Sequence, residues 1–208
     1  MGYFDLMNIL PFIDIIEDLN RDLSPQQRFL RLVAAIQRAI PCEAVGLLKL
    51  EGKYLLPVAM LGLKEEAMAR RFPLAGHPRL QNILANTQLV RFDAHSELPD
   101  PYDGLVDNEC EQLHVHDCMG STILIDGHPW GVLTLDAMKA GSFDALDPIE
   151  IRAMVAAVAA AIKASRHIEE LEARVEHKQQ VAQRLMETDY PPEIIGRSPA
   201  LVTMLGEI

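Results

Sequence analysis

Residues 119–138, MGSTILIDGHPWGVLTLDAM, decide the fold class, because two apolar runs flank one tight turn. Asp126 and Gly127 supply the turn, since both residue types tolerate the backbone angles of a two-residue hairpin loop. The flanking runs, MGSTILI and WGVLTLDAM, have the length and composition of strands. The stretch therefore predicts a β-hairpin.

The same pattern recurs upstream in residues 44–61, where AVGLLKL and YLLPVAML flank the turn EGK, so a second hairpin is expected. Helices bracket the two hairpins. A short amphipathic helix starts near Pro11, and a longer one follows the N-cap Ser24, with Gln27 as its capping-box partner. The last helix opens at Asp147-Pro148 and continues without a breaker to Pro191.

Between the hairpins the sequence predicts smaller elements: helical stretches at 64–71 and 77–85, a short strand LVRF at 89–92, and a long Pro- and Asp-rich loop from 93 to 110. The expected fold class is α+β. We expect an antiparallel sheet flanked by helices, mainly on one side, with a long C-terminal linker helix.

The part of the last helix beyond Ser165 has its own pattern. Apolar residues fall at three-and-four spacing between charges, which is typical of a parallel two-helix linker. Lys178 occupies one position of this seam and weakens it. We expect a homodimer through the seam residues Ile168, Leu171, Val175, Ala182 and Leu185.

Charge and composition exclude several classes of protein. The 30 acidic and 19 basic residues give a net charge of −11, which disfavours binding of a phosphate backbone by this chain. Three cysteines are too few, and odd in number, for a disulfide framework, so a reducing cytoplasm is expected. No apolar run approaches the ~18 residues that span a bilayer. We therefore predict a cytoplasmic protein without a membrane segment.

One window of the sequence contains no basic residue. No Lys or Arg lies between Phe92 and Met138, where composition alone predicts about four. The same window holds ten acidic residues, four of the seven histidines, and Cys110 and Cys118. Such a window repels anions and invites a cation.

Strand geometry narrows the candidates within the window. If residues 114–118, HVHDC, form a strand, side chains alternate, so His114, His116 and Cys118 share one face and could chelate a metal. In the next strand Asp136 is the lone charge. Its carboxylate is costly to bury unless it is paired, hydrogen-bonded or metal-bound.

Two further carboxylates, Asp100 and Asp103, lie on the Pro-stiffened loop LPDPYDG, which could close over that face. Carboxylate and imidazole ligands favour ferrous iron or manganese, and a single thiolate favours iron or zinc. The alternative is a solvated acidic loop with a hydrogen-bonded Asp136 and a core Cys118. No nucleophile and base can be assigned, so we do not expect an enzyme.

Five segments carry a family resemblance: GHPRL at 76–80, VRF at 90–92, SELPDPYDGL at 96–105, VHDC at 115–118 and LTLDAM at 133–138. They resemble the regulatory GAF domain of the NorR family of nitric-oxide-responsive, sigma-54-dependent bacterial activators. The similarity covers most of Ser24 to Ser165. The segment IIGRSPALVTMLGEI at 194–208 resembles the start of the AAA+ ATPase domain of such activators.

The residue pattern predicts an N-terminal amphipathic helix at 1–22 and a linker helix at 166–190, and the resemblance implies a GAF sensor domain at 23–165 and the start of a truncated AAA+ domain at 191–208. The resemblance also implies a mononuclear non-haem ferrous iron that binds nitric oxide. By motif position, the iron ligands would be Asp100, Asp103, His116, Cys118 and Asp136.

Arg79 is implied as a ligand or a nearby charge. A protonated guanidinium is an improbable ligand, so we expect Arg79 to hydrogen-bond a carboxylate or the bound nitric oxide. Asp117 stands where the family usually has a small apolar residue, which leaves open whether Cys110 or His114 takes part.

The resemblance implies that this domain holds the ATPase off until nitric oxide arrives, with the long helix carrying the signal. The fragment lacks a Walker A motif, and the full-length protein is expected to be an ATPase. Sigma-54 RNA polymerase and DNA would be contacted only through parts missing from this chain. The alternative is a GAF-type module that binds a small organic ligand or mediates dimerisation without a metal.

Overall fold

The computed structural model describes residues 10–93, 95–105 and 117–187. The chain divides into two compact units, Met1–Arg166 and His167–Ile208. The first unit contains the sheet, the helices before it and between its strands, and the part of the last helix that ends at Arg166. Within the described residues, no helix combines the length and apolarity needed to cross a membrane.

The first unit is built on one six-stranded sheet in the order β3-β2-β1-β6-β5-β4, in which every neighbouring pair is antiparallel. Both predicted hairpins are confirmed, as β1–β2 and β5–β6. Asp126 and Gly127 in the β5–β6 turn have φ angles of 53° and 78°, as the turn chemistry requires. The strands are β1 Ala44–Glu51, β2 Tyr54–Leu61, β3 Phe72–Pro73, β4 Val90–Phe92, β5 Asp117–Ile125 and β6 His128–Ala137.

Helices lie on both faces of the sheet. The Ser24–Gln27 capping box predicted for α2 is present, with both of its hydrogen bonds. The remaining predicted helices begin within a few residues of their expected starts. The helical elements are α1 Leu10–Leu19, α2 Pro25–Ala39, α3 Glu65–Met68, the 3-10 turn η2 Leu74–Gly76, α4 Pro78–Ala85 and α5 Pro148–Glu187.

The predicted helix at 64–71 is shorter in the structure. It is helical only over α3, because Phe72 is buried and pairs with Leu55 as the two-residue edge strand β3. Burial of this aromatic side chain in the core stabilises the extended backbone more than the local sequence pattern favours a helix. Strand β3 itself was not predicted, since two residues carry no periodicity.

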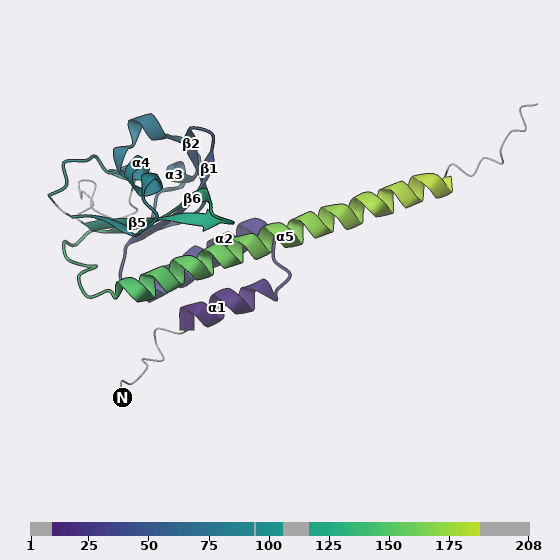
Figure 1. The fold of residues 1–208 in the computed structure, drawn as a ribbon, viewed down its shortest axis with the longest axis horizontal. Coiled ribbons are helices and arrows are strands. Elements are labelled where there is room, and N and C mark those ends of the chain that lie inside the picture. The colour runs from purple at the N-terminus through teal and green to yellow at the C-terminus, as the bar shows by residue number, and fades with distance from the viewer. Residues whose placement is uncertain (1–9, 94, 106–116, 188–208) are drawn as a thin grey trace, which may run out of the picture. The chain divides into compact units, whose positions relative to one another are not determined.

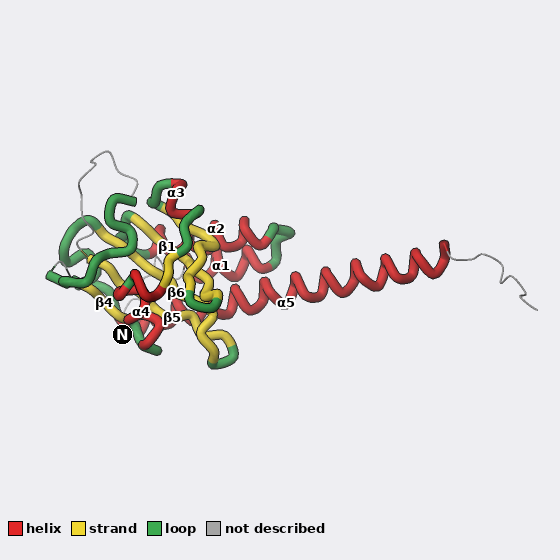
Figure 2. The backbone as a smooth tube through the Cα atoms, turned by 90° about the horizontal axis from the view of Figure 1, so that it is seen from above, coloured by secondary structure: helices red, strands yellow, loops and turns green. Residues whose placement is uncertain are grey.

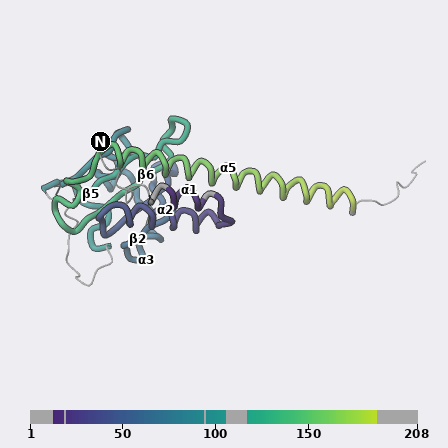
Figure 3. The backbone as a smooth tube through the Cα atoms, turned by 90° about the horizontal axis from the view of Figure 1, so that it is seen from below, coloured from purple at the N-terminus to yellow at the C-terminus, as the bar shows by residue number. Residues whose placement is uncertain are grey.

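The sheet separates two apolar cores. One lies between the sheet and α1, α2 and the first part of α5 (Figures 1 and 2). Seen from the helical side, α1 and α2 lie next to each other (Figure 3), and the ion pair between Arg31 and Asp18, at 2.7 Å, joins them. The other core contains residues of α3, α4 and the loop after β4, and it includes Cys118 and Tyr102. The long helices thus share one face, as predicted, while the candidate residues face the other.

Candidate metal centre

Three potential metal ligands meet on the face of the sheet opposite the long helices. Asp100, Cys118 and Asp136 each offer one ligand atom, and these atoms lie within 4.8 Å of one another. Strand register brings two of them together, because Cys118 of β5 is the direct cross-strand partner of Asp136 of β6. The third comes from the loop after β4, which folds over this face.

Asp136 is the most unusual of the three residues. It is 1% exposed, and neither carboxylate oxygen has a hydrogen-bond partner among the described residues. Burial, and then the nearby negative charge of Asp100, raises its pKa well above the ordinary value, and the neighbouring Cys118 thiol opposes that rise only in part. The predicted alternative of a hydrogen-bonded Asp136 stays a prediction, because residues 106–116 lie outside the described part of the chain and the neighbouring Cys118 thiol acts on the carboxyl in the direction of a hydrogen-bond donor. A buried carboxyl group without partners is expensive, and a cation would relieve that cost.

The Cys118 thiol is also held in its neutral form. Burial raises its pKa well above the ordinary value, and the charges of Asp136 and Asp100 add to the effect. Two carboxyl groups and a thiol that resist ionisation together would all ionise more readily beside a divalent cation. The chemistry of this donor set therefore fits a metal ion.

Asp100 is fixed in position by hydrogen bonds from two sides. Arg79 donates from Nη1 to one carboxylate oxygen at 2.6 Å, and the backbone N–H of Tyr102 donates to the other at 2.8 Å. Burial raises the pKa of Asp100, and these two donors oppose that rise. The carboxylate is thus oriented before any ion binds.

Arg79 acts as a partner of Asp100. Its Nε donates to the carbonyl oxygen of Leu98 at 2.8 Å, and its guanidinium lies 5.3 Å from the ring centre of Phe92. The side chain is 7% exposed, so Arg79 and Asp100 form a buried ion pair. This geometry agrees with the predicted hydrogen bond to a carboxylate, since the guanidinium offers only donors.

The structure does not bring every predicted ligand into the group. Asp103 is exposed, and its carboxylate lies outside the three-residue cluster. Its negative charge nevertheless contributes to the raised pKa of both Asp100 and Asp136. His116 lies outside the described residues, as do His114 and Cys110.

Tyr102 was not predicted from the sequence, although it lies between Asp100 and Asp103. Its side chain is fully buried, its hydroxyl lies 3.0 Å from Thr134 Oγ1, and its ring packs edge-on against Phe72. A Cβ on Gly46 would lie 3.0 Å from this hydroxyl, so the close approach depends on that glycine. Tyr102 anchors the acidic loop to β6, two residues from Asp136.

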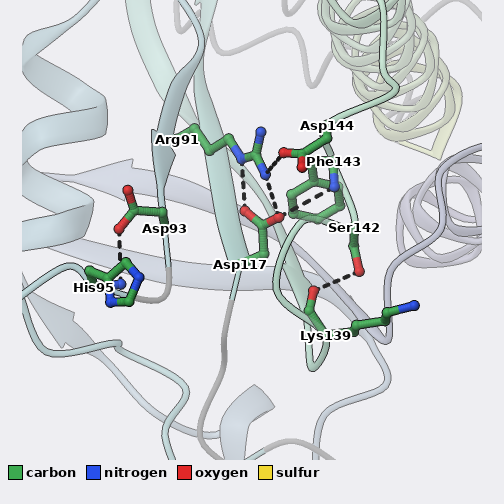
Figure 4. A network of polar contacts seen from close by, with 8 residues as sticks. All are labelled: Arg91, Asp93, His95, Asp117, Lys139, Ser142, Phe143 and Asp144. Carbon is green, nitrogen blue, oxygen red and sulfur yellow. Dashed lines mark hydrogen bonds and ion pairs between the residues drawn. The ribbon is translucent and has the colours of Figure 1, made fainter.

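A second feature that the sequence did not predict is a polar network on the opposite side of β5 (Figure 4). Arg91 of β4 donates two hydrogen bonds to Asp117, at 2.8 and 2.6 Å, and one to Asp144 at 2.6 Å. The N–H of Phe143 also donates to Asp117, at 3.3 Å. The Asp117 side chain is 1% exposed. This network joins β4, β5 and the segment before α5. Its central residue, Asp117, directly precedes Cys118 in β5.

The separations in the three-residue group suit one ion. Metal–oxygen and metal–sulfur bonds of roughly 2.0–2.3 Å place two ligands of the same ion at most about 4.6 Å apart. A ligand-atom spread within 4.8 Å therefore needs only small side-chain adjustments to close around a cation. The orphaned oxygens of Asp136 are the observation that favours such an ion most strongly.

Comparison with known families agrees with this architecture. The family model for the GAF domain matches residues 24–164. The chain belongs to the GAF domain family. Its fold resembles that of the GAF domain from a Coxiella burnetii phosphoenolpyruvate-protein phosphotransferase, with a TM-score of 0.61, 14% identity, and coverage of 84% of this chain and 99% of that one.

A bacteriophytochrome from R. palustris, RpBphP3, has a TM-score of 0.66 and 11% identity, covering 89% of this chain and 42% of that one. At these identities the likeness shows the GAF fold alone. The curled antiparallel sheet with its flanking helices is thus a GAF fold, as the sequence predicted.

Sequence relatives are more specific. The GAF chain is 42% identical over 199 residues to the nitric oxide reductase transcription regulator NorR1 of Cupriavidus necator, covering 94% of this chain and 38% of the relative. It is 36% identical over 202 residues to the anaerobic nitric oxide reductase transcription regulator NorR of Escherichia coli, with the same two coverages. The chain therefore spans 38% of the length of these relatives.

Proposed function

We propose that this GAF domain is the regulatory nitric-oxide sensor of a sigma-54-dependent transcription activator and that it holds a mononuclear non-haem ferrous iron. The observation that carries the proposal is the buried Asp136 carboxyl, without a hydrogen-bond partner among the described residues and directly opposite Cys118. The similarity to NorR regulators supports the choice of signal and regulated process.

Asp100, Cys118 and Asp136 would hold the iron, with Asp103 and His116 as the further ligands implied by the resemblance. Ferrous iron, when bound, supplies an exchangeable coordination position for neutral nitric oxide. Arg79 orients Asp100 through the 2.6 Å contact, and the buried side chains keep water from the carboxylates. Tyr102 holds the loop against β6 through Thr134.

The regulatory step would move from this site to the long helix. Asp136 lies one residue before the end of β6, and the segment that follows leads directly to α5. Asp117, the neighbour of Cys118, accepts the N–H of Phe143 in that same segment. A shift of β5 or β6 at the site would therefore act on the start of α5, and through it relieve inhibition of the AAA+ ATPase domain.

Iron retention tests the proposal. The chain of residues 1–208 is purified anaerobically, loaded with ferrous iron and desalted, and its metal content is measured. We expect close to one iron per chain for the native protein and for Cys42→Ser, whose cysteine lies outside the site, but almost none for Cys118→Ser. Equal iron content in the two serine variants, or no iron in the native chain, would contradict the site and favour a metal-free GAF module.

A further inference from the structure

Strand β5 extends beyond its neighbour β4 along one edge of the sheet. Strand β4 pairs only with residues 118–120 of β5, whereas β5 continues to Ile125. On this side, residues 121–125 have no strand partner among the described residues, although β6 pairs with them on the other side. The backbone N–H and C=O groups of alternate residues therefore point outward from a free strand edge.

A groove of about 660 Å³ follows this edge, and Ser121 and Thr122 both line it. Their cross-strand partners, Leu133 and Val132, belong to the two apolar cores on opposite sides of the sheet, so the two side chains point to opposite faces. A groove that reaches neighbouring residues of both faces runs along the edge of the strand. The free backbone groups of β5 are thus accessible from it.

The beginning of α5 lies below β5 in Figure 1, and its first turns form an apolar wall of the groove. Ile149 and Val155 contribute to this wall, and Leu89, from the segment before β4, also lines the groove. Ile149 is 72% exposed and Leu89 is 37% exposed. An extended chain placed along the free edge would direct alternate side chains toward α5 and cover these apolar groups.

The free edge carries neither of two common protections against pairing with another chain. Residues 121–125, STILI, contain no charged residue and no proline, which natural proteins often place on exposed edges. Their β-branched side chains also favour an extended backbone. An unprotected edge beside an apolar groove is the arrangement to which an extended peptide adds as a further strand.

Charge narrows the chemistry of such a peptide. Among the described residues that line the groove, only Arg152 is charged, and its side chain is exposed. A carboxylate on the peptide would pair with this guanidinium. The net charge of −11 disfavours a strongly acidic partner, so one carboxylate among apolar residues fits best.

We propose that the groove along β5 binds an extended peptide segment of a partner protein, which adds to the free edge as a strand. The segment carries apolar side chains at alternate positions and one carboxylate that pairs with Arg152. None of the described candidate iron ligands lines the groove, so this proposal and the proposed function fail or succeed separately.

Peptides of designed sequence test the groove. Each peptide has about eight residues, as an added strand requires, with Val or Ile at alternate positions and a single Glu, Gln or Lys among Thr at the others. Binding to the chain of residues 1–208 is measured by fluorescence polarisation. We expect the Glu peptides to bind at micromolar concentration, about fivefold more tightly than the Lys peptides. No binding by any of the peptides would overturn the proposal.

Variants of the chain locate the binding site. Ile149→Glu is expected to weaken binding of the Glu peptides by about tenfold or more, whereas Ile16→Glu, at an isoleucine of α1 that is 60% exposed and outside the groove, leaves it unchanged. Arg152→Glu is expected to reverse the preference from Glu to Lys peptides, while Arg70→Glu keeps it. Equal weakening by the two isoleucine variants, or an unchanged preference in Arg152→Glu, would overturn the proposal.

Backbone methylation of the peptide tests strand addition itself. N-methyl groups on one set of alternate residues remove the donors that face β5, so they are expected to abolish binding. The same groups on the other set face away from β5 and are expected to leave binding intact. Equal effects of the two sets would show that only side chains are recognised, as for a small apolar ligand, and would overturn strand addition. Binding that disappears as the concentration of the chain rises would assign the edge to a second copy and overturn it as well.

Discussion

Asp136 combines two properties at the residue scale that rarely occur together, complete burial and the lack of any hydrogen-bond partner among the described residues. Ordinary packing does not explain it, since an uncompensated carboxyl group costs stability. The cost is understandable if the residue is kept for a bound cation. Its pKa, raised first by burial, describes the domain before the ion arrives.

Asp136→Asn separates metal binding from folding. We expect this variant to lose iron while its metal-free form unfolds at the same or a higher temperature than the native domain, because a neutral amide replaces a buried carboxyl of equal size. Asp126→Asn is the matched control, since Asp126 lies in the turn of the same hairpin and Asn tolerates its φ of 53°. Iron content and thermal unfolding are measured together. Loss of folding in Asp136→Asn would show a structural role instead.

The pH dependence of stability follows from the same residue. In the unfolded chain the carboxyl group ionises near the ordinary aspartate pKa of 3.8, while in the folded domain the raised pKa keeps it protonated. The folded state then binds more protons, so the free energy of unfolding falls as pH rises above about 4, by at most about 1.4 kcal/mol per pH unit.

Chemical denaturation of the metal-free domain at several pH values measures this effect. Because other groups titrate as well, the relevant quantity is the difference between the native domain and Asp136→Asn. That difference is expected to grow with pH through the window above 4. A constant difference would mean that Asp136 ionises normally in the folded domain.

Single residues could be predicted from the sequence where they differ from their immediate neighbours in the chain. Asp136 could be selected because it is the only charge in an apolar strand, and Cys118 because strand alternation placed it on one face with His114 and His116. Tyr102 could not, since an aromatic residue in a Pro- and Asp-rich loop gives no sign of whether it turns inward. Its burial depends on the space that Gly46 leaves, 88 residues before Thr134 in the chain.

At the element scale, the contacts that hold short segments against the sheet contribute most to the stability of its edge. Strand β4 has three residues and pairs with β5 over only that length. Arg91 strengthens this edge, because it joins the buried Asp117 to the exposed Asp144 in the segment before α5. Both acidic partners hold the pKa of Arg91 above its ordinary value, through hydrogen bonds first.

Arg91→Met should therefore destabilise the domain. Removal of one partner leaves the Asp117 carboxylate buried without its two guanidinium bonds, and we expect a loss of about 2–3 kcal/mol, less than the ~3–5 kcal/mol of a fully buried pair because Arg91 is partly exposed. Asp144→Asn, which removes only the exposed partner, should cost below about 1 kcal/mol.

A double-mutant cycle checks the assignment. If the cost in Arg91→Met arises from the stranded carboxylate, adding Asp117→Asn should recover much of it, as measured by denaturant unfolding. Simple additivity of the two single losses would contradict the coupling between Arg91 and Asp117.

Element prediction from the sequence was strong for the hairpins, α2 and α5, where turn residues, caps and periodicity agree. It failed for α3, where the apolar pattern at 64–71 looked helical but Phe72 is drawn into the core as an edge strand. The Arg91 network was also out of reach, since its partners lie 26 and 53 residues away in the chain.

At the scale of the whole molecule, the sheet separates the apolar core under the long helices from the face that carries the candidate site. One face carries the apolar core under α1, α2 and the first part of α5, and the other carries the acidic loop, Cys118 and Asp136. The chain spans 38% of the length of its NorR relatives, so ATPase relief and contacts with polymerase remain proposals about a larger protein.

The same division explains why composition alone pointed to the region that holds the three clustered donors. The base-free window from Phe92 to Met138 contains the loop and both strands that supply the three clustered donors. The ligand number could not be predicted, because alternation places side chains on a face without fixing how far a loop such as the one bearing Asp103 closes over it.

Nitric oxide titration of the anaerobic, iron-loaded chain, followed by electron paramagnetic resonance, tests the central claim most directly. We predict a new paramagnetic signal that saturates at close to one nitric oxide per iron and is absent from Asp136→Asn treated identically, while Asp126→Asn behaves as the native chain. No signal from the native chain, or an equal signal from Asp136→Asn, would contradict an iron-based sensor at this site.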